Sequence, residues 1–253
     1  MDDKAAIVTG AGEGIGLAIA LALARAGSGI VLNDIDAGRA EAAAGSVRDQ
    51  GADCVVVVGD VADPELGPSL VAAAQRHFGG VSRLAANAGV TLFRPFLQTT
   101  GEDLDRLLAV NLRGSFFVAQ AISRHLSEQR SGGSIVFTSS VTGRRGHANL
   151  AAYAMTKAAL EGLVRTLAIE LAQHAIRVNA IVPGATLTSR NVAEDPSYAE
   201  VWAKRTPGAR VGMPEDQAQA AMFLLSEAAS HITGQALVVD GGWSVIGSTG
   251  ETG

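Results

Sequence analysis

Aromatic residues are scarce in this chain, since Phe, Trp and Tyr together make up 4 % of its 253 residues. The core must therefore rest on Ala, Val, Leu and Ile, which suits helices packed against a sheet better than an aromatic-rich sandwich. Cysteine is nearly absent too. With Cys54 alone, the chain can form no intrachain disulfide and no cysteine-based zinc site, so a reducing compartment, most simply the cytoplasm, is expected. Cys54 itself is expected to be a small buried hydrophobe.

Clustered positive charge is also missing. The formal net charge is −5 and no basic run is longer than Arg144-Arg145, which argues against nucleic acid as a partner. The longest apolar stretch, residues 15–24, is too short to span a bilayer, and the start, MDDK, lacks the basic character of a signal peptide. The five histidines show no metal-like spacing, so no catalytic metal is predicted.

Apolar residues make up 47 % of the chain and charged residues 18 %, which is enough for a sizeable core. Short apolar segments alternate with longer helical ones, and this alternation predicts an α/β, doubly wound parallel seven-stranded sheet, Rossmann-like, with helices on both faces. No linker or repeat divides the sequence, so residues 1–253 are expected to form a single dinucleotide-binding and catalytic domain. The expected strands are 5–8, 30–32, 54–58, 82–86, 134–138, 176–182 and 236–239.

Helices are expected between these strands, one of them opened by Pro64 at its first turn. The segment 185–213 lacks clean periodicity and contains Pro196 and Pro207. Long irregular segments in compact domains are often lids or binding loops, so this one is predicted to be a substrate lid. The other expected helices are 15–26, 36–50, 104–129, 151–173 and 214–226.

The first expected strand runs into a glycine-rich turn, TGAGEGIG, from Thr9 to Gly16. Glycines let a backbone approach a phosphate closely, and the helix that follows points its N–H groups at the anion. Asp34 ends the second strand, where a carboxylate can accept hydrogen bonds from both adenosine ribose hydroxyls. The alternative for Asp34 is a turn or capping acid before the helix that starts at Asp36. Strand, turn, helix and acid together predict a dinucleotide site.

The glycine spacing TGxxxGxG resembles that of the short-chain dehydrogenase/reductase family, and the resemblance covers essentially the whole chain. Other matching motifs are Asn87-Ala88-Gly89, where Ala86 replaces the family's usual first Asn, a Tyr-x-x-x-Lys pair, and the C-terminal Asp240-Gly241-Gly242. The cofactor-binding residues that the resemblance implies are Gly10, Glu13, Gly14, Ile15, Gly16, Asp34, Asp60, Val61, Asn87, Ala88, Gly89, Tyr153, Lys157, Pro183, Gly184, Thr186 and Thr188.

Tyr153 and Lys157 share one face of their expected helix. A lysine ammonium favours the phenolate of a nearby tyrosine, which makes Tyr153 usable as a general acid/base. By the resemblance, Ser140 holds the substrate oxygen, and Asn111 helps to hold a water that links Lys157 to solvent. From the residues alone, three alternatives stay open. Tyr153 and Lys157 could form a surface helix contact, Ser140 could simply end its strand, and Asn111 could face solvent.

Together these features predict an NAD(H)-dependent oxidoreductase that interconverts a secondary alcohol and a ketone. Glu13 stands where NADP-binding relatives often carry Arg or Lys, and both Glu13 and Asp34 would repel a 2′-phosphate, which favours NAD as the cofactor. Two alternatives stay open: an NADPH-dependent 3-oxoacyl thioester reductase, and a dinucleotide-binding regulator without turnover.

Substrate specificity is expected in the segment 141–152, because it lies between the two residues that flank the reacting carbon. The loop after Asn87-Ala88-Gly89 would add Phe93 or Arg94. The two arginines of the segment, Arg144 and Arg145, are expected to form a solvent-facing basic turn. The candidate substrate contacts within the segment are Thr142, His147 and Leu150.

The resemblance also implies a homo-oligomer, most simply a homotetramer. The family pairs its two long helices, here 104–129 and 151–173, across one interface, and the tail after Asp240-Gly241-Gly242 would join a second. Small side chains on the second helix would allow close packing there, although part of that face could pack on its own sheet. These residues are Ala151, Ala154, Ala158 and Ala159.

Overall fold

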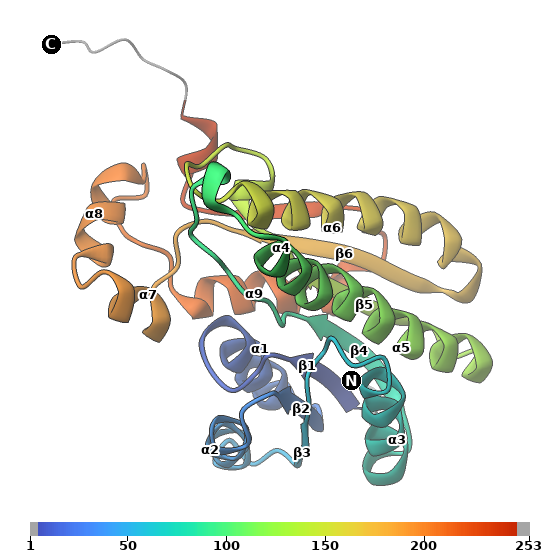
Figure 1. The fold of residues 1–253 in the computed structure, drawn as a ribbon. Coiled ribbons are helices and arrows are strands. Elements are labelled where there is room, and N and C mark those ends of the chain that lie inside the picture. Colours follow the sequence, from blue (N-terminus) through green and yellow to red (C-terminus); the bar gives the residue numbers. More distant parts are fainter. Residues whose placement is uncertain (1–4, 247–253) are drawn as a thin grey trace, which may run out of the picture.

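The computed structural model describes residues 5–246, and a seven-stranded sheet lies at its centre (Figure 1). The strands are arranged in the order β3-β2-β1-β4-β5-β6-β7, and every neighbouring pair is parallel. The order reverses between β1 and β4, which creates a topological switch point there. The predicted Rossmann-like sheet is confirmed. Its strands are β1 Ala5–Thr9, β2 Ile30–Asp34, β3 Cys54–Val58, β4 Val81–Ala86, β5 Gly133–Thr138, β6 Ile176–Pro183 and β7 Ala236–Val239.

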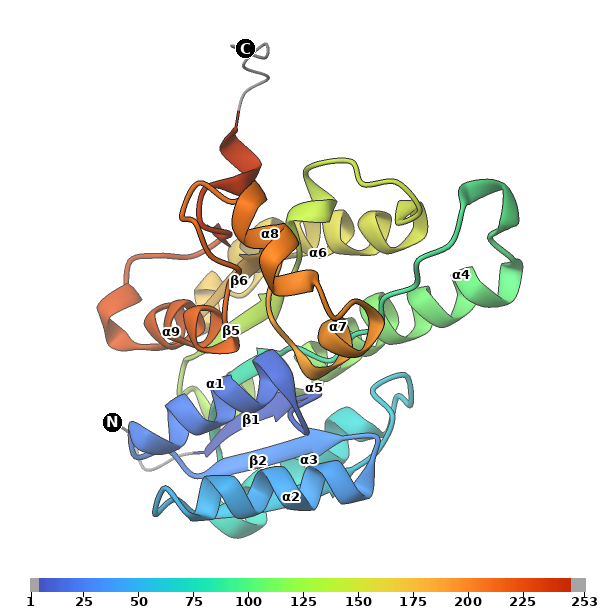
Figure 2. The same ribbon diagram turned by 90° about the vertical axis from the view of Figure 1, so that its left-hand side faces the viewer.

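Helices cover both faces of the sheet. On one face α1, α2 and α9 share a core rich in alanine, and Figure 2 shows α1 and α9 side by side. On the other face α3, α5 and α6 pack over a second core. The helices are α1 Gly14–Arg25, α2 Ala37–Arg48, α3 Leu66–Phe78, α4 Gly101–Leu107, α5 Ser115–Gln129, α6 Ala151–Glu170, α7 Ser189–Glu194, α8 Tyr198–Arg205 and α9 Pro214–Leu225.

The central strands are continuous apolar runs because both faces of a parallel sheet are buried. All five residues of β1 are buried, as are all six of β4. Aliphatic side chains fill these cores, and Phe137 is the one aromatic among the largest fully buried side chains of the described residues. The low aromatic content therefore suits this core.

Two expected helices differ from those observed at their N-terminal ends. Pro64 lies in a turn before α3, which begins at Leu66, because Asp60 and Asp63 accept backbone N–H bonds that hold residues 60–65 in turns. The expected helix 104–129 is three pieces: α4, a π-helical segment Leu108–Gly114, and α5. π-helical turns are rare and occur frequently at functional sites.

The region 185–213 is not irregular, since it folds into α7 and α8. These helices have only 6 and 8 residues, too few turns for a helical period to stand out in the sequence. Figure 1 shows both set apart from the sheet on one side of the molecule. No helix within residues 5–246 is long and apolar enough to cross a membrane.

Candidate active site

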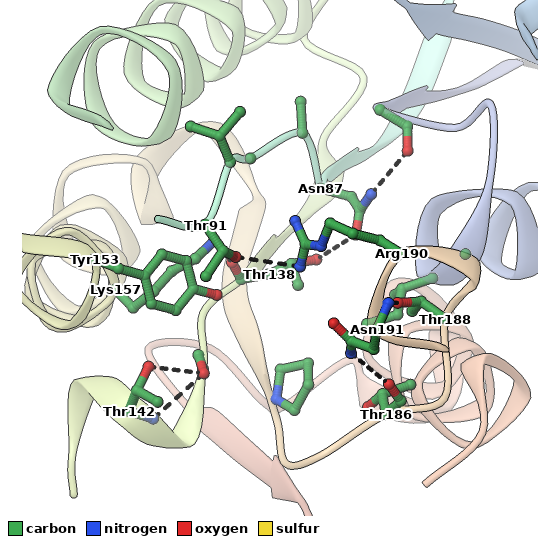
Figure 3. Close-up of a pocket in the computed structure, with 18 of the residues that line it drawn as sticks. Asn87, Thr91, Thr138, Thr142, Tyr153, Lys157, Thr186, Thr188, Arg190 and Asn191 are labelled. Atoms are coloured by element: carbon green, nitrogen blue, oxygen red, sulfur yellow. Dashed lines mark hydrogen bonds between the residues drawn. The ribbon is translucent and has the colours of Figure 1, made fainter. Parts of the chain in front are cut away.

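A cavity of about 960 Å³ opens at the carboxyl ends of the strands (Figure 3), where open α/β sheets bind ligands. All seven strands lead residues to it: Gly10 follows β1, Asp34 ends β2, Asp60 follows β3, Asn87 follows β4, Ser140 follows β5, Gly184 follows β6 and Trp243 follows β7. Every candidate site residue named above borders the cavity except Gly16, Asn111 and Arg94. The sequence motifs, far apart along the chain, therefore meet in one place.

The glycine-rich turn leads directly into α1. Gly10 and Gly14 both adopt φ +59°, a conformation that favours glycine. The preceding residue, Glu13, makes no side-chain cap, and no acid stands in the first turn of α1. The first N–H groups of the helix are therefore available to an anion in the cavity. Gly16 has a different role, since a Cβ there would run into the Gly10 carbonyl and the Asn87 amide.

Asn87 joins three strands at the switch point. Its Nδ2 donates to the carbonyl oxygens of Thr9 and Gly10, at 3.2 and 3.0 Å. Its Oδ1 accepts from Thr138 Oγ1 at 3.1 Å. Thr9 Oγ1 in turn accepts the backbone N–H groups of Asn87 and Ala88. The sequence analysis did not find the roles of Thr9 and Thr138, which show only as hydroxyl residues at strand ends.

Asp34 is fixed by the backbone. Its Oδ2 accepts the Gly12 N–H at 2.9 Å and its Oδ1 accepts the Asp36 N–H at 3.0 Å. The capping alternative for Asp34 is wrong, because the N-cap of α2 is Asp36, whose Oδ1 accepts the Arg39 N–H. Asp34 does hold the turn before this helix through its bond from the Asp36 N–H.

Arg39 also borders this end of the cavity, and the sequence analysis missed it. Its Nη1 lies 2.9 Å from Glu13 Oε1, and its Nη2 lies 4.0 Å from Asp34 Oδ1. The two carboxylates expected to repel a 2′-phosphate are thus accompanied by a guanidinium. In the sequence, only the position of Arg39 shortly after Asp34 could have indicated that it borders the site.

These features fit a dinucleotide. The uncapped start of α1 suits the pyrophosphate, and the fixed Asp34 carboxylate suits ribose hydroxyls. Ile35, 63 % exposed, borders the cavity together with Val61 and offers an apolar surface for a flat base. The charge, hydrogen-bonding and apolar groups lie in the order that adenosine and pyrophosphate would need.

Lys157 is 4 % exposed and lies beneath the Tyr153 ring (Figure 3). Its Nζ is 5.6 Å from the ring centroid and donates to the Thr138 carbonyl at 2.8 Å. Burial lowers the pKa of Lys157, Tyr153 opposes this shift, and Arg190 adds to it. Because Lys157 is buried and donates to a backbone carbonyl, the surface-contact alternative for this pair is wrong.

Ser139 and Ser140 differ in what holds them. Ser139 Oγ lies 2.9 Å from the Lys157 carbonyl and 3.2 Å from Glu161 Oε1, and it donates to these buried acceptors. Ser140 Oγ instead accepts from the N–H and the hydroxyl of Thr142, at 3.3 and 3.0 Å. With its oxygen so occupied, the Ser140 hydroxyl has its own proton to donate into the cavity.

Asn111 is fully buried in the π-helical segment, so the solvent-facing alternative is wrong. Its Oδ1 accepts the Val90 N–H at 2.8 Å, and its Nδ2 donates to the Val90 carbonyl and to Thr156 Oγ1. A Cβ on Gly89 would lie 3.3 Å from Asn111 Oδ1 and 3.4 Å from Lys157 Nζ. The amide therefore lies close behind Lys157 without bordering the cavity.

The three candidate substrate contacts, Thr142, His147 and Leu150, all border the cavity. The half-buried His147 meets Phe93 edge to face, with ring centroids 6.1 Å apart. Of the two alternatives in the loop after β4, Phe93 borders the cavity. Arg94 instead pairs with Asp103, Nε to Oδ2 at 3.1 Å.

Residues 10–244 match the model of the family described as enoyl-(acyl carrier protein) reductase. The chain is 38 % identical over 248 residues to an L-rhamnose 1-dehydrogenase (NAD(P)(+)) from Sphingomonas sp. strain SKA58, covering 97 % of this chain and 98 % of the relative. It is 34 % identical to a 5-keto-D-gluconate 5-reductase from Escherichia coli K12, covering 96 % of each. The solved structure of a levodione reductase superimposes with a TM-score of 0.90 at 32 % identity, covering 97 % of this chain and 99 % of that one.

The chain belongs to the short-chain dehydrogenase/reductase family. The predicted family is thereby confirmed, as are the predictions of an oxidoreductase acting on CH–OH groups and of a nicotinamide dinucleotide cofactor. The choice between NAD and NADP is not decided by these likenesses, since the rhamnose enzyme is named for both.

In this short-chain dehydrogenase/reductase Arg144 and Arg145 do not border the cavity, and Arg144 is exposed as expected, although both side chains have hydrogen-bond partners. Arg144 Nε lies 2.8 Å from the buried carboxylate of Glu161, and its Nη2 donates to the Ala236 carbonyl. Arg145 Nη1 donates to the Trp243 carbonyl at 2.7 Å. The buried acid on α6 holds Arg144, and carbonyl groups near the C-terminus hold both side chains, and none of these partners is near in sequence.

The region 185–213 also lines the cavity with residues that the sequence analysis missed. Arg190 projects toward the Tyr153 side of the cavity in Figure 3, where its Nη2 donates to Thr91 Oγ1 at 3.2 Å. Asn191 Nδ2 donates to the Thr186 carbonyl at 2.8 Å. No local motif marks these side chains, so only the folded positions of α7 and α8 reveal them. The other missed residues of this region include Tyr198, Trp202 and Arg205.

Proposed function

We propose that this enzyme interconverts a secondary alcohol and a ketone with NAD(H), and that Tyr153 is its general acid/base. The observation that carries the proposal is the buried Lys157 ammonium beneath Tyr153 in a cavity that Ser140 also borders. The nicotinamide dinucleotide, when bound, supplies the hydride acceptor for oxidation and the hydride donor for reduction.

Each catalytic side chain has a distinct task in this proposal. In oxidation the Tyr153 phenolate takes the proton of the substrate hydroxyl at its Oη. In reduction the same oxygen returns a proton to the carbonyl oxygen. Ser140 donates a hydrogen bond to the substrate oxygen as its charge changes. Lys157 supports the phenolate and binds the nicotinamide ribose. Asn111 helps to hold a water that connects Lys157 to solvent.

NAD(H) is the cofactor that the charges favour. The ribose end of the cavity carries the carboxylates of Glu13 and Asp34 against the single guanidinium of Arg39, so the local balance stays negative. Asp34 is held in place by two backbone N–H groups, and it cannot turn away from a 2′-phosphate without losing both bonds. Repulsion at close range then disfavours NADP(H).

A panel of secondary alcohols and ketones, followed by NADH absorbance, tests the function. Wild-type enzyme should turn over at least one alcohol–ketone pair, with kcat/KM for NAD(H) above that for NADP(H). Binding of dinucleotide without any turnover across the panel would favour the regulator alternative. A preference for NADPH together with turnover of 3-oxoacyl thioesters would favour the reductase alternative.

Assembly as a homotetramer is the quaternary state that we propose. Half-exposed or exposed apolar side chains on α5 and α6 support it: Phe116 and Phe117 are 40 % and 39 % exposed, and Ile169 is 80 % exposed. On α6, Ala158 and Ala159 are also exposed, which permits close approach of a second copy. Light scattering at micromolar concentration checks this, and a monomeric mass would refute it. Most of the C-terminal tail, 247–253, lies outside the described residues, so its part in a second interface stays a prediction.

A cytoplasmic location is likewise proposed. Its support is the use of cysteine, because the single thiol of Cys54 is buried and serves no disulfide. Fractionation of the native host, with the enzyme detected by antibody, would check the location.

A further inference from the structure

Both tryptophans and both tyrosines of this chain border the active-site cavity. Tyr153 is the proposed acid/base, and the other three form a cluster that the proposed chemistry does not use. We call Tyr198, Trp202 and Trp243 the aromatic wall. In a chain with 4 % aromatic residues, this concentration at one cavity is the feature that calls for a function.

The aromatic wall is a connected set of rings from two remote segments. Tyr198 and Trp202 belong to α8, and Trp243 follows β7. The Trp202 and Trp243 centroids are 5.5 Å apart with a 75° angle between planes, and Tyr198 lies 6.0 Å from Trp202. Aromatic pairs in such edge-to-face and tilted arrangements are attractive, so the rings hold one another in position.

A guanidinium lies over each tryptophan of the wall. The Arg205 guanidinium lies 5.5 Å from the Trp202 centroid, and the Arg145 guanidinium lies 4.9 Å from the Trp243 centroid. Arg145 also donates to the Trp243 carbonyl. Each tryptophan is therefore oriented by a neighbour, while both remain partly exposed and border the cavity.

The wall is not part of a core. None of the residues of α8 is buried, and neither of the two clusters that form the described core includes any of the three rings. Partly exposed large rings are costly in water, and Tyr and Trp are the side chains that suit a surface with one apolar face and one wet edge. A ligand with a flat apolar face would remove this surface from water.

We infer that the aromatic wall binds the flat apolar face of a ring in the substrate, so that this enzyme prefers cyclic secondary alcohols and ketones to open-chain ones. The inference rests on the proposed function and names its substrate class. Polar groups at the same cavity, among them His147, Arg190 and Glu194, are placed to meet substituents on the ring edge. The ring belongs either to a carbocycle or to a sugar, since both present such a face.

Fluorescence gives a readout that does not need turnover, because both tryptophans of the chain lie in the wall. The Tyr153→Phe variant with saturating NAD⁺ is titrated with 1-tetralol, with L-rhamnose, and with open-chain 2-octanol as the matched comparison. We expect a saturable change in tryptophan emission with at least one ring compound, at a Kd at least fivefold below that for 2-octanol. A response to 1-tetralol identifies the ring as a carbocycle, and a response to L-rhamnose identifies it as a sugar.

Kinetics give the second readout. In the wild-type enzyme, kcat/KM for the ring substrate that responds should exceed that for 2-octanol. Trp202→Ala should lower this ratio about five- to tenfold, mainly through KM, as the loss of an aromatic contact implies. Trp202→Phe should keep most of the ratio. Phe223→Ala, which removes a 41 % exposed ring on α9, is the matched control and should leave it unchanged.

The outcomes separate this inference from the proposed function. The inference would be overturned if wild type and Trp202→Ala showed the same ratio of kcat/KM for the ring substrate to kcat/KM for 2-octanol, and neither ring compound changed the tryptophan emission. Turnover in that case would still uphold the proposed function. An emission change without turnover of any alcohol by wild type would uphold ring binding and overturn the function. If Trp202→Ala does not fold, the titration and the Trp202→Phe ratio still decide.

Discussion

The cofactor end and the substrate end of the cavity are built by different means. At the cofactor end, backbone groups and buried side chains of β1, β2, β4 and β5 hold one another, as Asn87 and Asp34 show. At the substrate end, α7 and α8 contain no buried residue, and partly exposed side chains such as Trp202 provide the lining. The part that we propose to bind the cofactor is fixed by the core, and the part that we propose to select a substrate is carried on short helices outside it.

This difference has consequences for substitution. Changes at the cofactor end or at the catalytic centre should remove all activity, whatever the substrate. Changes at the substrate end should alter which compound is used while leaving cofactor binding and folding largely intact.

The largest effect is expected at the catalytic centre, where the two ends meet. Tyr153→Phe removes the proton donor and keeps the ring above Lys157. We expect kcat to fall by roughly 10²- to 10⁴-fold, the range that general acid–base groups contribute, for every substrate alike. NADH binding, measured by fluorescence enhancement, should change little. Near-wild-type turnover in this variant would remove Tyr153 from its role.

A nearly equal loss is expected from Gly16→Ala, because a Cβ would lie 2.6 Å from Asn87 Nδ2 and would also meet the Gly10 carbonyl. Gly10 belongs to the turn before α1 and Asn87 holds that turn through its hydrogen bonds, so NADH affinity and thermal stability should fall together. Gly45→Ala in α2 is the control, since nothing lies within 4 Å of a Cβ there. That variant should be neutral or more stable by about 0.5–1 kcal/mol. Similar melting temperatures for the two variants would contradict the proposed rigidity.

The same contrast governs what sequence could reveal. The glycine turn, Asp34 and the Asn87 motif are local patterns tied to strand ends, and topology brings strand ends together, so their convergence was predictable. The pair Tyr153 and Lys157 was predictable because a helix fixes their spacing. These elements need only local geometry and a parallel sheet.

What sequence could not reveal depends on contacts between remote segments. Arg144 is exposed as expected, but its partners, Glu161 on α6 and the Ala236 carbonyl on β7, are known only once these elements are placed. Arg39 lies beside Glu13 only because the two turns after β1 and β2 are neighbours. The short helix α8 leaves no periodic signal. Charge partners and lining residues of this kind follow from the fold and not from the motif.

A moderate effect is expected on cofactor choice. Asp34→Asn removes one charge while keeping an oxygen for the Gly12 N–H, so kcat/KM for NADPH relative to NADH should rise about tenfold, as expected for the loss of one close like charge. Arg39 is then the remaining partner for a 2′-phosphate. Adding Arg39→Ala should cancel most of the gain. A gain that survives without Arg39 would show that this guanidinium has no part in the choice.

A smaller effect is expected from Thr142, which holds Ser140 through its hydroxyl. Thr142→Val keeps the shape and removes one hydrogen bond, worth about 0.5–1.5 kcal/mol, so kcat should fall roughly two- to tenfold with little change in KM. Thr142→Ser should restore kcat. A fall in KM alone, or no rescue by serine, would mean that Thr142 acts by packing and not by orienting Ser140.

The smallest effect concerns Cys54 on β3, an edge strand of the cofactor half. Burial raises the pKa of its thiol from 9.0 to about 11, so the folded protein binds the thiol proton more tightly than the unfolded chain does. The stability from this difference is fully present below pH 9 and is lost as the pH rises toward 11. In urea unfolding, the free energy of unfolding should therefore fall slightly more between about pH 8 and about pH 10.5 in wild type than in Cys54→Ala. Iodoacetamide should label the native thiol slowly at about pH 8. Labelling as fast as in urea would show that β3 opens readily and that the cofactor half is less rigid than its hydrogen bonds imply.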